Sequence, residues 1–192
     1  MSALAIRPIY ETHIAQDEAE IRAFIDLLRQ ENVGSYLEIG ARYGGSFWRV
    51  STSLPVGSRV IAVDLPDGMG GKGAAAIDAL GACVEQLKRN GYDAYLIQGD
   101  SRSADVVALA RALGPYDCTF IDADHSLEGV TRDWENYGPM SKMVAFHDIA
   151  CSNPDKPIKV MQFWDSIKGG YRHQEFKFHH TGRHNGIGVL WK

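Results

Sequence analysis

A glycine-rich turn is the first stretch of this sequence whose residue types suit ligand binding. The apolar run Tyr36-Leu-Glu-Ile ends at Gly40, and Gly44, Gly45 and Ser46 follow before an amphipathic run. This order predicts a strand, a tight turn and a helix. Glycine lets a ligand approach the backbone closely, and the free N–H groups of a helix N-terminus would point at that ligand.

Polar side chains stand where the apolar runs of this sequence end. They are Glu38, Asp64, Asp100, Ser101, Asp122, His147 and Asp148. Turn chemistry alone favours Asp and Ser at such places, but so full a set is more than turns require. In an open parallel sheet, ligands bind beyond the carboxyl ends of the strands. We therefore expect these groups to face a ligand site, provided that the runs form parallel strands.

The elements that must position these groups alternate along the chain. After the strand that leads into Gly40, strands are expected at 59–64, 94–98, 118–122 and 143–146. Helical patterns lie before and between them, beginning near Asp17, Ala74, Ala104 and Ser126. This alternation predicts an α/β fold with a Rossmann-like, doubly wound sheet that is covered by helices on both faces.

The end of the chain departs from this alternation. A helix is expected from Pro157, and its residues expected to face the core are Ile158, Met161, Trp164 and Ile167. Two β segments follow at 174–178 and 186–191. Because a loop joins them, they predict an antiparallel pair at one edge of the sheet.

Composition limits the class of protein. The 192 residues suit a single domain, 1–192, in which residues 1–16 form an N-terminal arm. A net charge of −4 without a basic stripe argues against nucleic acid as a main partner. The sequence shows neither a membrane-spanning stretch nor a signal peptide. Three widely spaced cysteines indicate no disulfide framework. We expect a cytoplasmic enzyme, and a homo-oligomer stays open.

Taken together, the motifs resemble those of class I S-adenosylmethionine-dependent methyltransferases. The turn Leu37-Glu-Ile-Gly-x-x-x-Gly44-x-Ser46 is similar to the first motif of that class, most closely to that of small metal-dependent O-methyltransferases. The segments Phe120-Ile-Asp-Ala-Asp-His-Ser-Leu-Glu-Gly-Val130 and Ala145-Phe-His-Asp148 resemble the branch of macrolide-sugar O-methyltransferases and cephalosporin-hydroxylase-like proteins. The resemblance covers residues 17–192. It implies a seven-stranded sheet, mostly parallel with an antiparallel C-terminal strand, and methylation of a hydroxyl on a small molecule such as a sugar, a phenol or a natural product.

The resemblance also implies how S-adenosylmethionine would bind. The cofactor-binding residues implied are Glu38, Gly40, Gly44, Ser46, Asp64, Asp100, Ser101 and Asp124. Glu38 would orient the amino group of the methionine part, and Asp64 would accept the ribose hydroxyls. Asp100 and Ser101 would hold the adenine edge. The alternative for Asp64 is a turn cap, whereas burial of Glu38 without a ligand would be costly.

A divalent cation held by Asp122, His147 and Asp148 is a further implication of the resemblance. Such a cation would bind the acceptor hydroxyl, lower its pKa and orient it. Magnesium is the ion implied, but the relatives usually carry a carboxylate or another oxygen donor where this sequence has His147. Imidazole suits zinc, manganese, iron or nickel better. A softer metal, weak magnesium binding and a His147 outside the coordination shell therefore stay open, as does a histidine that binds no metal.

His125 lies three residues after Asp122, the spacing at which the macrolide-sugar enzymes carry a catalytic histidine. The resemblance implies that His125 is a general base, which takes the hydroxyl proton as the oxygen attacks the methyl group. The alternative is that His125 only caps the helix that follows.

Two further segments of the sequence are expected to form loops. The glycine-rich residues 65–73 form either a loose connection or a mobile lid. His179, His180 and His184 are interpreted as a surface loop, with an acceptor pocket as the alternative.

A metal-independent methyltransferase and a methyltransferase-like binding protein without turnover stay open. A nicotinamide dehydrogenase is disfavoured because the turn lacks the G-x-G spacing.

Overall fold

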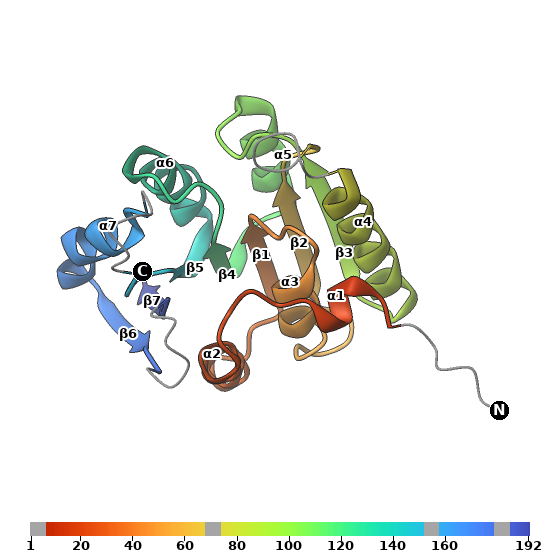
Figure 1. Cartoon of the computed structure of the whole chain (residues 1–192), viewed down its shortest axis with the longest axis horizontal. Helices are drawn as coiled ribbons and strands as arrows, with labels where there is room; N and C mark the ends of the chain where they lie inside the picture. Colours follow the sequence, from red (N-terminus) through yellow and green to blue (C-terminus); the bar gives the residue numbers. More distant parts are fainter. Residues whose placement is uncertain (1–6, 68–73, 152–157, 179–184) are drawn as a thin grey trace.

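A seven-stranded sheet forms the centre of the protein (Figure 1). The structure, a computed structural model, describes residues 7–67, 74–151, 158–178 and 185–192. The strands are β1 (Ser35–Ile39), β2 (Arg59–Asp64), β3 (Asp93–Gln98), β4 (Tyr116–Ile121), β5 (Ser141–His147), β6 (Arg172–Phe176) and β7 (Ile187–Trp191). Their order is β3-β2-β1-β4-β5-β7-β6. The first five pair in parallel, and β7 runs antiparallel to β5 and β6. The predicted mostly parallel sheet with an antiparallel end is confirmed.

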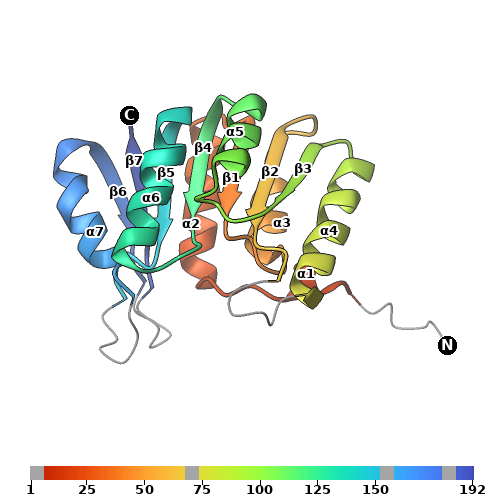
Figure 2. The ribbon, with the colours of Figure 1, turned by 90° about the horizontal axis from the view of Figure 1, so that it is seen from above.

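Helices cover both faces of this sheet (Figures 1 and 2). The core on one face takes side chains from α1 (Ile9–Thr12), α2 (Glu18–Gln30), α3 (Gly45–Ser51) and α4 (Ala74–Arg89). The core on the other face takes side chains from α5 (Ala104–Leu113), α6 (Leu127–Tyr137) and α7 (Val160–Ile167). Within the described parts of the chain, no helix has the length and apolar character needed to cross a membrane.

The parallel strands are apolar on both sides because each side faces a layer of helices. In β1, Tyr36 packs into the core beneath α2 and α3, while Leu37 and Ile39 pack into the core beneath α5 and α6. Successive side chains of a strand point to opposite faces. Glu38 is two residues from Tyr36, so its carboxylate is placed on the same face as α3 and the glycine-rich turn.

The tail agrees with its prediction in part. Trp164 is buried and the partly buried Ile158 and Ile167 pack against the core, as expected. Met161 is only partly buried, while Val160 and Phe163 are buried beside Trp164. The ring of Trp164 covers Gly188 of β7 so closely that a Cβ atom there would lie 2.7 Å from ring atoms. The β segment predicted at 174–178 also starts earlier, at Arg172, because it pairs with β7 from Trp191 back to Ile187.

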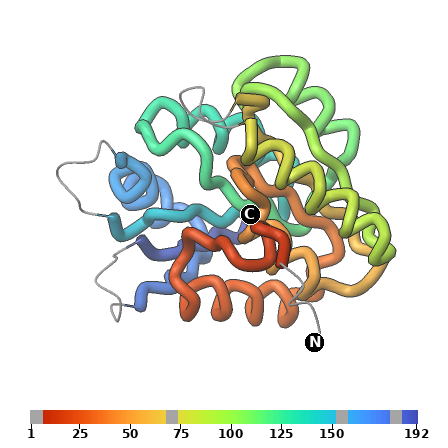
Figure 3. Tube along the Cα trace, turned by 45° about the vertical axis from the view of Figure 1, so that its right-hand side comes forward, coloured from red at the N-terminus to blue at the C-terminus, as the bar shows by residue number. Residues whose placement is uncertain are grey.

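The segment Pro8–Asp17, which we call the strap, lies across the edge of the sheet where the parallel strands end. In Figures 2 and 3 its trace turns back from the start of α2 toward α3 and α4. The ring of Tyr10 lies 5.1 Å from that of Trp48. A Cβ atom on Gly45 would lie only 1.8 Å from the carbonyl oxygen of His13. The described part of the predicted N-terminal arm is therefore packed against the glycine-rich turn.

Candidate functional site

Glu38 is a fully buried carboxylate at the end of β1. The Tyr36 hydroxyl donates a hydrogen bond of 2.6 Å to Oε2, and the Ser46 hydroxyl donates to Oε1. Burial, together with the nearby carboxylates of Asp122 and Asp64, outweighs the two hydroxyl donors and raises the pKa of Glu38 to about 8. Without a cationic partner, Glu38 is therefore held in its protonated form at neutral pH.

The backbone conformation of the turn requires glycine at Gly40 and Gly44. Gly40 has a φ of +89°, and a Cβ atom there would lie 2.3 Å from the carbonyl oxygen of Asp122. Gly44 precedes α3 with a φ of +86°. The absence of a side chain at Gly40 thus lets the loop after β4 approach the end of β1. This brings Asp122 and Glu38 to the same end of the sheet.

Replacing Gly40 with alanine is expected to destabilise the fold by at least ~2 kcal/mol, because left-handed strain and a backbone clash add together. Gly57→Ala is a control for the strain alone, since Gly57 has a φ of +92° and open space around it. Gly81→Ala, in α4 with nothing within 4 Å of its Cβ position, is expected to stabilise by up to ~1 kcal/mol. Urea unfolding of the three variants is the measurement. Equal losses in Gly40→Ala and Gly57→Ala would contradict the clash.

Asp64 ends β2 beside the turn. Its Oδ2 accepts the backbone N–H of Arg42, and its Oδ1 accepts that of Leu65 at 2.7 Å. Burial raises the pKa of Asp64, and these two N–H donors oppose the shift. The carboxylate is thus oriented by backbone groups on both sides, and each oxygen retains a lone pair for a hydroxyl donor.

Asp100, Ser101 and Asp124 are brought together by residues that the sequence analysis did not select. Arg102 donates to Asp100 at 3.0 Å and lies 3.5 Å from Oδ2 of Asp124. The Ser101 hydroxyl donates to Oδ1 of Asp133 in α6 at 2.7 Å. Burial raises the pKa of Asp133 to about 6. The signal that could have revealed Asp133 is a carboxylate at an inward-facing position between Val130 and Tyr137.

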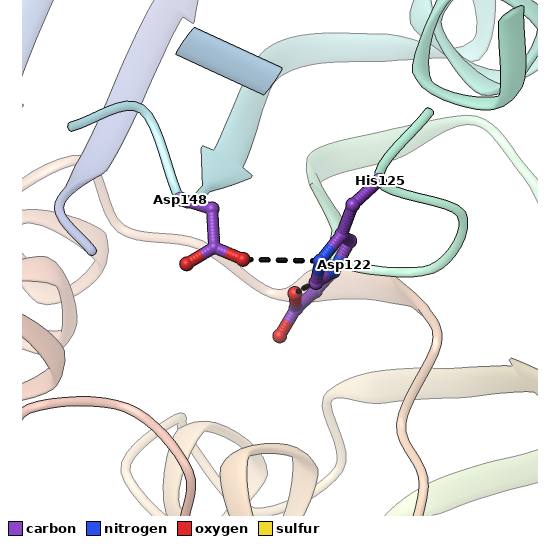
Figure 4. Close-up of side chains that lie close together, drawn as sticks. All are labelled: Asp122, His125 and Asp148. Atoms are coloured by element: carbon purple, nitrogen blue, oxygen red, sulfur yellow. Dashed lines mark hydrogen bonds and ion pairs between the residues drawn. The ribbon is translucent and has the colours of Figure 1, made fainter. Parts of the chain in front are cut away.

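A cluster of two carboxylates and two imidazoles lies at the ends of β4 and β5. The ring of His125 stands between Asp122 and Asp148, as Figure 4 shows. Its Nε2 lies 3.1 Å from Oδ1 of Asp122, and its Nδ1 lies 3.1 Å from Oδ2 of Asp148. Nδ1 of His147 lies 3.3 Å from Asp122 and 3.4 Å from Asp148. The backbone of Asp148 adopts a φ of 61°, which turns the chain at the end of β5.

Mutual charge sets the protonation of this cluster. Burial alone would lower the pKa of His147, but Asp122 and Asp148 outweigh it and raise the value to about 9. Burial alone would also lower the pKa of His125, but the same two carboxylates outweigh it and raise the pKa. Burial would raise the pKa of Asp122, yet the two histidines hold it well below its usual range. With both ring nitrogens facing carboxylates, His125 is placed as a double donor in this arrangement.

The donor atoms of this cluster fit a divalent cation. One ligand atom from each of Asp122, His125 and Asp148 lies within 4.8 Å of the other two. Two carboxylates and one imidazole suit manganese or zinc, and the carboxylates alone suit magnesium. The predicted set contained both aspartates but took His147 as the third ligand. The geometry places His125 in the closest group, while His147 contacts the same carboxylates from the buried side.

Gln16 of the strap joins this cluster, which the sequence did not reveal. Its side chain is buried and its Nε2 donates to Oδ2 of Asp122 at 2.7 Å. No sequence pattern links two residues this far apart in the chain. The loop at 65–73, for which a loose connection and a mobile lid both stayed open, and the histidines His179, His180 and His184 lie outside the described residues, apart from Leu65, Pro66 and Asp67.

A family model and solved structures of methyltransferases are similar to this chain. Residues 37–149 match a family model described as a methyltransferase domain. The O-methyltransferase from Bacillus cereus in complex with SAH superimposes with a TM-score of 0.70 and 16% identity, covering 92% of this chain and 82% of that chain. The O-methyltransferase TomG from Streptomyces achromogenes, involved in tomaymycin synthesis and in complex with SAM, superimposes with a TM-score of 0.68 and 14% identity. The match covers 93% of this chain and 82% of that chain. Among curated proteins, none matches this chain.

Proposed function

The chain belongs to the methyltransferase domain family, and from this premise we propose that it transfers the methyl group of S-adenosylmethionine to a hydroxyl oxygen of a small molecule. The observation that carries the proposal is the shared edge of the sheet. The buried carboxylate of Glu38 lies at the end of β1, and the cluster of Asp122, His125 and Asp148 lies at the ends of the adjacent β4 and β5. In this proposal the donor site and the acceptor site are therefore adjacent.

On the donor side, we assign Glu38 to the amino group of the methionine part. A cation beside this buried carboxyl would favour its ionised form, so binding would release a proton. Asp64, oriented by the N–H groups of Arg42 and Leu65, is assigned to the ribose hydroxyls. Ser101, held by Asp133, and Asp100 are assigned to the adenine edge, with Asp124 beside them.

On the acceptor side, the carboxylates of Asp122 and Asp148 would hold a divalent cation, and His147 would be its third ligand, from the buried side. The cation would lower the pKa of the acceptor hydroxyl and orient its attacking oxygen. The bound methyl donor would supply a methyl carbon that bonds to this oxygen as its carbon–sulfur bond breaks, with the electron pair leaving on sulfur. His125, more exposed than His147, would take the hydroxyl proton once its ring has left the two carboxylates and released one of its own two ring protons to solvent.

A second ligand arrangement is favoured by the mutual distances, in which His125 itself is the third ligand. Titration of His125→Ala and His147→Ala with Mn²⁺ separates the two. Loss of Mn²⁺ affinity in His147→Ala alone supports His125 as the base. Loss in His125→Ala alone assigns His125 to the cation and removes it as the base.

Calorimetry tests the donor site directly. The protein is expected to bind S-adenosylmethionine and S-adenosylhomocysteine, and because both carry the same amino group, binding of either is expected to release a proton from Glu38. The heat measured in two buffers of different ionisation enthalpy gives the number of protons. No binding of either compound, with or without Mg²⁺ or Mn²⁺, would refute the proposal. Turnover that survives exhaustive chelation would refute the metal assistance alone.

A further inference from the structure

The two oxygens of the Asp122 carboxylate have separate partners. Oδ1 faces the histidines, at 3.1 Å from Nε2 of His125 and 3.3 Å from Nδ1 of His147. Oδ2 points the other way and accepts the amide of Gln16 at 2.7 Å. An ionised carboxylate only accepts hydrogen bonds, so the nitrogen of the amide must be the atom that faces it.

The strap fixes Gln16 from both sides. Before it, Tyr10 packs on Trp48 and the backbone at His13 lies tightly against Gly45. After it, Asp17 accepts the N–H of Ala19 at 2.8 Å and begins α2. Gln16 itself is only 8% exposed. Its amide is therefore held against Asp122 by packing, whereas a free surface glutamine would lose side-chain entropy on forming this bond.

We propose that Gln16 is a positioning residue for the cation site, which turns the Asp122 carboxylate so that Oδ1 faces the cation. This inference rests on the proposed cation site. Hydrogen bonds to the far oxygen of a ligating carboxylate set the direction of the near one, and their loss typically weakens metal binding by ~10- to 100-fold. Gln16 also belongs to the segment that covers the glycine-rich turn, so one strap contacts both halves of the site.

Mn²⁺ titration of the whole chain, followed by electron paramagnetic resonance, tests this role. Gln16→Met keeps the volume and flexibility of the side chain but removes the donor. It is expected to weaken Mn²⁺ binding by ~10-fold or more and to change the spectrum of the bound ion, because the carboxylate is free to rotate. Tyr10→Leu is the matched structural control, since it loosens the strap at Trp48 and retains the Gln16 amide. Glu11→Gln, at an exposed position of the same strap, should bind as the wild type does.

Each outcome has one meaning. Wild-type affinity in Gln16→Met overturns the inference while the cation site stands. An equal loss of affinity in Tyr10→Leu at equal thermal stability also overturns it, because loosening of the strap alone would then explain the effect. Absence of Mn²⁺ binding by the wild type refutes the proposed cation site, and the role of Gln16 with it. A selective loss in Gln16→Met supports the inference.

Discussion

Replacing Glu38 with glutamine is expected to abolish most donor binding and, at the same time, to stabilise the protein without ligand at alkaline pH. The glutamine keeps the shape of the side chain and can still contact the hydroxyls of Tyr36 and Ser46. It cannot pair with a cationic amino group. Removing one partner of a buried charge pair costs ~2–5 kcal/mol, so affinity for S-adenosylmethionine should fall at least ~30-fold.

The stability change follows from the pKa of Glu38, which is about 8 in the fold against an ordinary value of 4.5. The folded state retains a proton that the unfolded chain loses above the ordinary value. The stabilisation from this group is therefore fully present below about pH 4.5 and is lost progressively as the pH rises to about 8, by ~1.4 kcal/mol for each pH unit. Glutamine does not titrate, so Glu38→Gln lacks this loss.

Urea unfolding at about pH 5 and about pH 8 measures this difference, and calorimetry measures the affinity. The wild type should lose more stability than Glu38→Gln between the two pH values. Glu85→Gln, at an exposed position of α4, is the control and should follow the wild type in both experiments. Parallel pH profiles for wild type and Glu38→Gln would show that Glu38 is ionised in the unliganded fold.

Replacing Asp122 with asparagine is expected to abolish activity and cation binding while sparing the donor site. Asp122 contacts His125, His147 and Gln16, so its charge is central to the cluster. A neutral amide should reduce Mn²⁺ affinity by at least ~100-fold, more than loss of a partner that only orients a ligand. Affinity for S-adenosylhomocysteine should change by no more than ~3-fold, because Glu38 and Asp64 are untouched.

Stability should fall in the same variant. His147 is buried, and its charged form depends on the two carboxylates. Removing one partner of such a group costs ~3–5 kcal/mol. Asp117→Asn is the matched control, because Asp117 lies near the opposite end of β4 and pairs with the exposed Lys142. That variant should retain Mn²⁺ binding. An active Asp122→Asn enzyme would remove metal assistance from the mechanism.

The fold was predictable because its signals are local. Apolar runs, glycine stops and helix caps lie within a few residues of one another. Asp17 and Ser126 accept the N–H groups expected of caps. The parallel order then follows from the short crossovers. The core-facing side of α7 was predicted in part. Trp164 is buried and Ile167 packs against the core as expected, but Val160, which the helical pattern did not select, is also buried.

The site was predictable in its residue types and not in its contacts. Acids that end parallel strands must lie at one edge of the sheet, so the sequence alone places Glu38, Asp64 and Asp122 together. It does not determine that the His125 ring lies between two carboxylates, or that Gln16 reaches Asp122. Those contacts join residues that are distant in the chain or depend on side-chain rotation. They form only when the strap, the sheet and the loops after β4 and β5 pack against one another.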